Sequence, residues 1–238
     1  MGKNIPFISD AMLHSVCPFG AVASLYQVIV KGTYTHQIHD SSFVVLFLVI
    51  FLTLLFGAVF CGWVCPLGTV QEWTGKLGKR IMGKNYNHIM PKKTDELLRY
   101  LRFIVLAWVL YATATTGLLA FKSLDPYYAL FHFWTGEAAL TAVIILVITL
   151  LGALLIERPW CKYLCPFGVV LGILSKISFF TLKRNKETCI NCSACNRACP
   201  MNIEITNSYS VRHTNCIVCL NCTSENACPY PRSEEHTS

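Results

Sequence analysis

Three uncharged, mostly apolar stretches constrain the fold of this chain more than any other feature. They cover residues 42–60, 103–121 and 138–156, nineteen residues each. At about 1.5 Å of rise per residue, each forms a helix roughly 28 Å long, close to the hydrocarbon thickness of a bilayer. The sequence therefore predicts three transmembrane helices. A fourth uncharged stretch, 11–30, contains His14, Pro18 and Gln27; it is read as a span, a re-entrant segment or a remnant, and we favour four helices over three.

The average composition, 54% hydrophobic and 14% charged, conceals two different regions. Residues 1–180 hold the apolar stretches and form the predicted membrane domain. Residues 181–231 are polar and turn-rich and contain eight of the thirteen cysteines. The last seven residues, 232–238 (RSEEHTS), resemble translated sequencing-adapter read-through and are left out of the fold prediction.

We interpret the formal charge of +7 as a sign of which loops lie on the cytoplasmic side of the membrane, and not as a nucleic-acid-binding surface. Eight Lys and Arg residues lie in 76–102, whereas the neighbouring connections hold only Lys31 and Lys122. Because basic loops stay on the cytoplasmic side, segment 76–102 is predicted to be cytoplasmic. Segments 31–41 and 122–137 then lie outside, and the cysteine-rich domain lies in the cytoplasm, on a multi-pass protein of the cytoplasmic (inner) membrane.

The strongest chemical signal is a run of closely spaced cysteines followed by proline, present in two copies. The first copy is Cys189-x2-Cys192-x2-Cys195-x3-Cys199-Pro200 and the second is Cys216-x2-Cys219-x2-Cys222-x5-Cys228-Pro229. The first matches the bacterial ferredoxin spacing, and the second has a longer last gap. A zinc knuckle is the alternative, but structural zinc normally uses two separated ligand pairs. We therefore predict two [4Fe–4S] clusters that carry single electrons.

The ferredoxin pattern also assigns the ligands, because the fourth cysteine of each run crosses to the other cluster. The first ligand set is then Cys189, Cys192, Cys195 and Cys228. The second ligand set is Cys216, Cys219, Cys222 and Cys199.

A second motif, CxxxCP, occurs at the predicted cytoplasmic ends of two spans. Its cysteines are Cys61 and Cys65 in CGWVCPLG and Cys161 and Cys165 in CKYLCPFG. A degenerate third copy keeps Cys17 but has Leu13 in place of the leading cysteine. These four thiols suffice for a further thiolate-ligated metal centre. They could equally form redox-active disulfides, or pack helix ends as small apolar side chains.

Charged and aromatic residues flank the CxxxCP motifs. Trp63 and Trp160 suit the headgroup region, and Arg158 can pair with Glu157 or with lipid phosphate. A sharper alternative is a quinone pocket in which Glu72 or Glu157 exchanges protons. The chain has no P-loop, no GxGxxG motif and no haem-attachment motif, so its electrons must come from and go to other molecules.

At CGWVCPLG, RPWCKYLCPFG and the paired CxxCxxCxxxCP-type runs, the chain resembles the NapH/NosR/CcoG-like family of membrane polyferredoxins. The compact NapH-like form is the closest in layout. The resemblance implies a four-helix membrane part, two cytoplasmic cubanes, and electron traffic between the quinone pool or a cytoplasmic donor and a partner such as a periplasmic reductase.

The expected fold is an all-α transmembrane bundle of three or four helices followed by a small α+β domain like a bacterial 2[4Fe–4S] ferredoxin. The expected function is a membrane-bound relay that links quinol or a soluble donor to partner redox subunits. One rival is a metal reductase that delivers electrons to copper through the CxxxCP thiols. Another is a redox-sensing or assembly factor without turnover.

Overall fold

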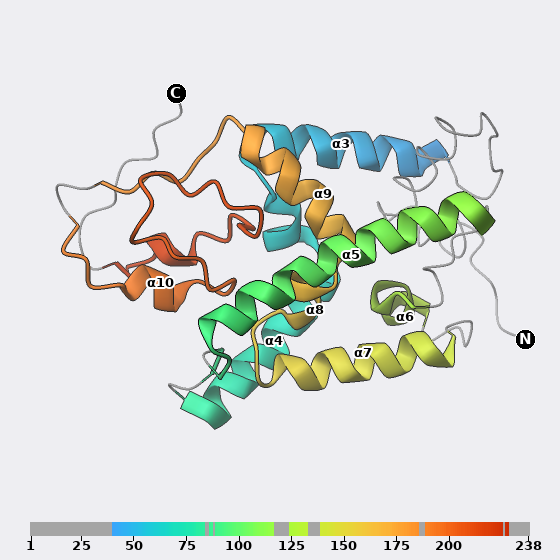
Figure 1. Cartoon of the computed structure of the whole chain (residues 1–238), viewed down its shortest axis with the longest axis horizontal. Coiled ribbons are helices and arrows are strands. Elements are labelled where there is room, and N and C mark those ends of the chain that lie inside the picture. Colours follow the sequence, from blue (N-terminus) through green and yellow to red (C-terminus); the bar gives the residue numbers. More distant parts are fainter. Residues whose placement is uncertain are drawn as a thin grey trace, which may run out of the picture. The chain divides into compact units, whose positions relative to one another are not determined.

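The computed structural model describes residues 40–83, 86–87, 89–116, 124–132, 139–185, 189–225 and 227–228. The stretch at 11–30, with Cys17, lies outside the described residues. The elements in chain order, drawn in Figure 1, are α3 (Asp40–Phe56), η1 (Phe60–Val64), α4 (Pro66–Met82), α5 (Lys92–Thr116), α6 (Pro126–His132), α7 (Leu140–Ala153), α8 (Pro159–Tyr163), α9 (Pro166–Leu174), η4 (Ser175–Ile177), α10 (Ala194–Ala198) and η5 (Asn221–Thr223).

The chain divides into two compact units, 1–50 with 105–148 and 51–104 with 149–238. The first contains the short helix α6. Its start is capped by the Asp125 carboxylate, which accepts a hydrogen bond from the Tyr127 N–H at 2.9 Å. Near its end the rings of Tyr128 and His132 stack with centroids 3.9 Å apart. A polar cap and a stacked pair thus hold a helix too short to be stable alone.

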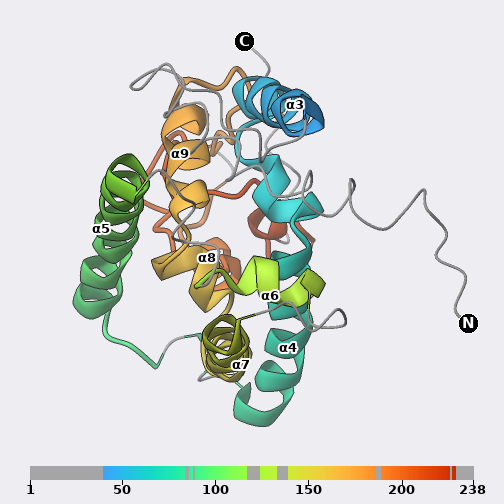
Figure 2. The ribbon, with the colours of Figure 1, turned by 90° about the vertical axis from the view of Figure 1, so that its right-hand side faces the viewer.

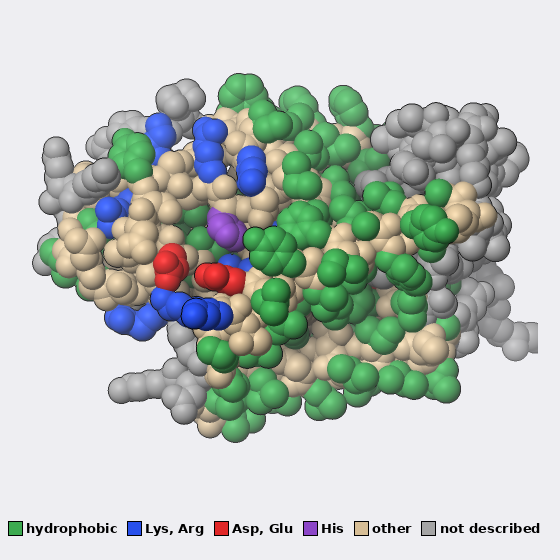
Figure 3. All heavy atoms as spheres, viewed as in Figure 1, with side chains coloured by type: hydrophobic (Ala, Val, Ile, Leu, Met, Phe, Trp, Pro, Cys, Tyr) green, Lys and Arg blue, Asp and Glu red, His purple; other side chains and the backbone are tan. Residues whose placement is uncertain are grey.

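Within the described residues, Lys92–Thr115 is the one helix long and apolar enough to cross a membrane. The predicted spans at 42–60 and 138–156 correspond to the shorter helices α3 and α7, and α9 is a further short apolar helix. Figure 3 shows many hydrophobic side chains on the surface that faces the viewer. Leu97, Ile104, Tyr111 and Leu140 are each more than 60% exposed. Such large apolar surfaces suit contact with lipid. A bundle of three or four spans stays a prediction.

The helix α5 begins well before the stretch predicted from residue 103, because its charged first half is neutralised by ion pairs. Asp95 pairs with Arg99 one turn later on the same helix and with Lys162 Nζ at 2.6 Å. Tyr163 also donates its hydroxyl to the Asp95 carboxylate. Buried charges persist where they are paired, so the helix can continue through residues that hydropathy alone excludes.

The second unit carries the cysteine motifs on short helices and irregular chain. Figure 2 shows α8 followed directly by α9, and Figure 1 shows the cysteine-rich segment as coil around α10. The expected α+β character is reduced among the described residues to one isolated antiparallel bridge, Lys183 to Ser210. The segments between the cysteine runs are short and turn repeatedly, which leaves little extended chain for a ladder of strands.

Two glycines let α4 pack closely inside the second unit. A Cβ atom at Gly78 would lie 2.2 Å from the carbonyl oxygen of Leu154, and one at Gly75 would lie 2.4 Å from the Tyr86 hydroxyl. Both glycines are buried on the same face of α4. This face therefore requires small residues, as close helix contacts generally do.

We expect Gly78→Ala to lower the free energy of unfolding by about 1–3 kcal/mol, because the added methyl group meets rigid backbone. Thermal unfolding of the detergent-solubilised protein measures it. Gly152→Ala is the matched control, since its Cβ would make ordinary contacts at 3.5 Å with Pro159. Equal melting temperatures for Gly78→Ala and the native chain would contradict the close packing.

Candidate functional site

The two CxxxCP motifs adopt the same local structure. In each, the second cysteine is an extended N-cap, with φ −64° and ψ 112° at Cys65 and φ −69° and ψ 110° at Cys165. The proline that follows is the first residue of a helix, α4 or α9. Proline suits this position because its missing N–H needs no helical partner. The motif is thus a helix-start signal that places one cysteine before the helix and one in the preceding turn.

The structure brings the four CxxxCP cysteines together. Cys61 lies within electrostatic reach of Cys65 and Cys161, and Cys165 lies within reach of all three. The Gln71 side chain, from α4, donates a hydrogen bond to the Cys161 sulfur at 3.6 Å. Burial, with the nearby Cys65, raises the pKa of Cys161 to about 12. Four half-buried thiols from two motifs one hundred residues apart therefore lie within electrostatic reach of one another.

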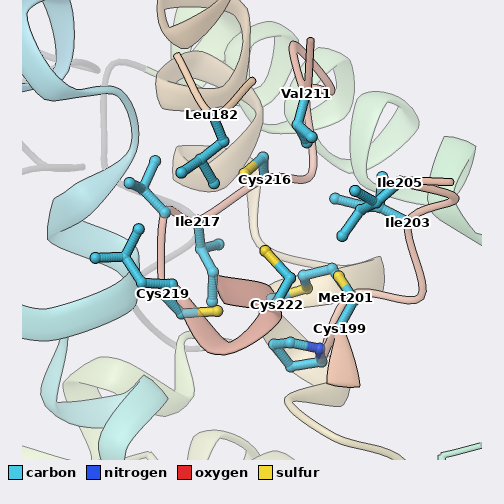
Figure 4. Close-up of a pocket in the computed structure, with 13 residues that line it drawn as sticks. Leu182, Cys199, Met201, Ile203, Ile205, Val211, Cys216, Ile217, Cys219 and Cys222 are labelled. Carbon is cyan, nitrogen blue, oxygen red and sulfur yellow. The ribbon is translucent and has the colours of Figure 1, made fainter. Parts of the chain in front are cut away.

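The second ligand set also gathers. Cys199, Cys216, Cys219 and Cys222 line one pocket with apolar neighbours that include Met201 and Ile217, as Figure 4 shows. Burial raises the pKa of the Cys219 thiol to about 11. Cys61 and Cys161 pack against the same hydrophobic core. The second ligand set and the CxxxCP thiols are therefore neighbours inside one compact unit.

The first ligand set lies nearer the surface. Cys192 and Cys228 are exposed, whereas Cys199 of the second set is buried. Arg184 approaches the Cys189 sulfur with Nη1 at 3.5 Å. In the described part of the chain no hydrogen bond joins the Cys228 thiol to the first motif. Among all described residues, the CxxxCP cysteines included, no three His, Cys, Asp or Glu side chains are placed to hold a single metal ion. None of the twelve described cysteines forms a disulfide.

The backbone of the two cysteine runs is wound alike, which tests whether they fit a cluster. Asn191 and Ser193 in the first run have φ of 55° and 56°, and the equivalent Val218 and Leu220 in the second have 50° and 60°. Asn191 tolerates a left-handed conformation, but this conformation is unfavourable for Ser193 and Leu220 and most of all for β-branched Val218, at a cost of about 1–3 kcal/mol each. Its recurrence at matched positions indicates that the loops are shaped around their cysteines. Soft thiolates on such loops suit iron–sulfur ligation.

Backbone N–H groups also lie near the sulfurs of the second set. Burial raises the pKa of Cys199 and of Cys216, and the N–H groups of Met201 and Ile203 near Cys199 and of Val218 near Cys216 offset part of this rise. Such donors favour thiolate over thiol. Since hydrogen bonds to cluster sulfurs are a main lever on reduction potential, these donors fit a cluster better than simple packing.

Glycines seat the second run against the CxxxCP repeats. A Cβ at Gly62 would lie 2.4 Å from the Ile217 carbonyl oxygen, and one at Gly172 would lie 2.1 Å from that of Thr214. Next to Gly62, the Trp63 indole donates to the Val218 carbonyl at 3.0 Å. Trp63 was expected to be an interfacial anchor; it is still exposed, but it also holds the cysteine loop.

One polar residue of the site, Asn87, was not identified from the sequence, and the partner of another, Arg158, differs from the expected one. Asn87, in a left-handed turn, donates to the Pro200 carbonyl at 3.2 Å and accepts from the Glu157 N–H at 3.2 Å. Arg158 pairs with Glu72 at 2.7 Å and not with Glu157, its expected partner. The RPW triplet directly before the third CxxxCP copy was a sequence signal for Arg158, whereas Asn87 lies in no motif.

The two carboxylates beside the CxxxCP motifs differ in their titration. Burial alone would raise the pKa of Glu72, but its hydrogen bond to Arg158 and the charge of Arg158 hold it below the ordinary value. Burial raises the pKa of Glu157, and the charge of Arg158 offsets this only in part. The pKa of Glu72 is therefore lowered and that of Glu157 is raised, so Glu157 takes up a proton at a higher pH than Glu72 does.

We expect Gly62→Ala to loosen the seat of the second cysteine run, because its methyl group would overlap the Ile217 carbonyl. The expected loss is about 1–3 kcal/mol in the free energy of unfolding, with faster proteolysis of the 214–228 segment. Gly168→Ala, at the last position of the other CxxxCPxG motif, is the control, since its Cβ would have no neighbour closer than 3.7 Å. Unchanged proteolysis of Gly62→Ala would refute this contact.

We expect the native chain to lose stability as pH rises from the ordinary carboxyl pKa through the raised pKa of folded Glu157. In that window the folded state binds more protons than the unfolded state, so stability falls with pH. Glu157→Gln cannot ionise and should lack this fall, which makes it the more stable chain near neutral pH. Denaturation midpoints between about pH 4 and 8 measure both. Parallel curves for the two chains would rule out a raised pKa.

One protein family covers the two CxxxCP motifs. The family described as a 4Fe-4S binding domain matches residues 40–85 and 138–187, two segments that each contain one CxxxCP motif. No solved structure matches the chain significantly.

Three curated relatives illustrate the similarity. The putative electron transport protein YccM of Escherichia coli is 31% identical over 89% of this chain and 60% of its own length. An uncharacterized protein of Methanocaldococcus jannaschii is 32% identical over 94% of the chain and 89% of the relative. The ferredoxin-type protein NapH of Haemophilus influenzae is 32% identical over 64% of the chain.

The chain spans 60% of YccM and 51% of that NapH. Matches to NosR of Stutzerimonas stutzeri and to the methylamine utilization protein MauN of Paracoccus denitrificans extend the same group. The names of these relatives describe ferredoxin-type, electron-transport and regulatory proteins. The chain belongs to the NapH/NosR-like family of 4Fe–4S ferredoxin-type electron-transport proteins.

Proposed function

We propose that the chain is a membrane-bound relay that passes electrons between quinol or a cytoplasmic donor and a partner reductase. The observation that carries the proposal is the common core of the second ligand set and the CxxxCP thiols, in which Cys61 and Cys161 pack against the residues around Cys199. Two groups of soft ligands that pack on one hydrophobic core would give electrons a short route between them. Neither group alone would suggest a relay.

The proposed cofactors are two [4Fe–4S] clusters held by residues 181–231. Cys189, Cys192, Cys195 and Cys228 would hold one, and Cys199, Cys216, Cys219 and Cys222 would hold the other. Bound clusters supply reversible one-electron chemistry. The matched loops present the thiolates, the N–H groups of Met201, Ile203 and Val218 stabilise their charge, and the apolar pocket limits water.

The four CxxxCP thiols would form a third redox or metal centre at the membrane side of the route. Their gathering into one place argues against four independent packing roles, since cysteines that serve only as small apolar residues need not converge. Unoccupied, these thiols stay protonated because burial raises the pKa of Cys61 and Cys161. Ligation would therefore release protons.

The proposed location is the cytoplasmic membrane, with residues 1–180 as a multi-pass domain and the cluster-binding part on the cytoplasmic side. The apolar α5 and the basic segment 76–102 support it. The exposed Cys192 and Cys228 would let a soluble donor or partner subunit approach the first cluster. The quinone pool would meet the chain at the membrane side.

Anaerobic iron and acid-labile sulfide quantification with EPR tests the proposal, on the native chain and on a Cys61/Cys65/Cys161/Cys165→Ser variant. We expect more than about eight irons in the native chain and about eight in the variant, the content of two cubanes. About eight irons in both proteins would exclude an iron-containing third centre. The CxxxCP cysteines would then form disulfides or serve in packing. The absence of cluster EPR signals from the reduced native chain would overturn the relay itself.

A further inference from the structure

Arg158 lies where the Cys61–Cys65 motif meets the second cysteine run. Its side chain is 3% exposed, and its guanidinium donates from Nη1 to the Cys61 carbonyl at 2.7 Å and from Nη2 to the Gly62 carbonyl at 3.2 Å. The planar fork of a guanidinium can make both bonds at once, which a lysine ammonium does less well. Arg158 thus holds the turn that contains Cys61.

The turn held by Arg158 is the one seated on the second cysteine run through Gly62 and Trp63. The guanidinium consequently lies within electrostatic reach of two thiols, Cys161 of a CxxxCP motif and Cys219 of the second ligand set. One buried positive charge is therefore shared by the two groups of sulfur ligands that the proposed relay connects.

The positive charge of Arg158 and Arg102 near this junction is greater than the negative charge of Glu72, the carboxylate partner of Arg158. Glu72 accepts from Arg158 Nη2 at 2.7 Å, but its side chain is 34% exposed, so solvent screens its charge. Arg102, 3% exposed, lies within reach of Cys61 and Cys165, and its Nε has no hydrogen-bond partner in the described part of the chain. Buried cations are costly unless anions accompany them. Thiolate ligands of a bound centre supply that negative charge.

We propose that Arg158 is a positioning residue that fixes a positive charge beside Cys161 and Cys219. This charge raises the reduction potential of the centre that one of these thiols ligates. The inference rests on the proposed function, because it requires that Cys161 or Cys219 is a ligand of a redox centre. Reduction by one electron, supplied by the titrant, adds one negative charge to the centre and neither makes nor breaks a bond. A fixed cation stabilises that added charge more than the oxidised form.

The test is an EPR-monitored redox titration of the purified full chain, with iron content measured on the same samples. Arg158→Gln removes the positive charge, Glu72→Gln removes its counter-charge, and Arg80→Gln removes an exposed cation of α4 as a control. We expect Arg158→Gln to lower the reduced-to-oxidised ratio of one centre about tenfold at a fixed potential, a shift of ~59 mV for a one-electron couple. Glu72→Gln should shift the same centre in the opposite direction, and Arg80→Gln should leave it unchanged.

Opposite shifts at native iron content support the charge effect, since a merely structural role would not give signs that follow the charge. If Arg158→Gln does not retain iron, Glu72→Gln and Arg158→Lys test the inference in its place. An unchanged reduction potential in Glu72→Gln overturns it. A downward shift in Arg158→Lys as large as the one expected for Arg158→Gln also overturns it. Equal potentials in the native and Arg158→Gln chains also overturn it. A native chain without iron and without cluster signals would instead refute the proposed function, so the two failures are distinguishable.

Discussion

The contact of the Gly62 backbone with the Ile217 carbonyl is the constraint on which the rest of the second unit depends. Because no side chain separates these segments, a CxxxCP turn and a cysteine loop from the other end of the chain approach backbone to backbone. Gly172 repeats the arrangement on α9, and the Trp63 and Arg158 hydrogen bonds fix its orientation. The cysteine-rich segment is thus built into the helices and is not a module on a tether.

This integration explains why buried charge is so abundant in the second unit. Asp95 with Lys162 and Glu72 with Arg158 are ion pairs between segments far apart in the sequence. Removal of one member of such a pair would leave the other charge buried and unpaired, which is costly. Charge pairing therefore specifies which segments meet, while the glycines decide how closely.

The sequence predicts the candidate site in more detail than the ends of the helices. Cysteine spacing predicts two ligand sets, and the structure gathers the residues of the second around one pocket, because ligand spacing is a local property of the chain. Hydropathy located the apolar segments but not their ends. The helix α5 starts at Lys92, and Lys162, one of the two ion-pair partners of Asp95, lies dozens of residues away in the sequence. The Arg158–Glu72 pair and the Asn87 bonds were missed for the same reason.

The CxxxCP repeat was visible in the sequence, and its position at equivalent helix ends already allowed the four thiols to gather at one face. Each copy ends in the same extended cysteine and helix-starting proline, so local rules explain each half separately. Only the packed fold places the halves together.

The glycine at position 62 has one more consequence. Electron tunnelling between redox groups weakens exponentially with the separation of their edges, and every side chain inserted between two ligand loops adds to that separation. A residue without a side chain at the point of contact lets the two loops approach closely, so in the proposed relay Gly62 would shorten the distance that an electron has to cross.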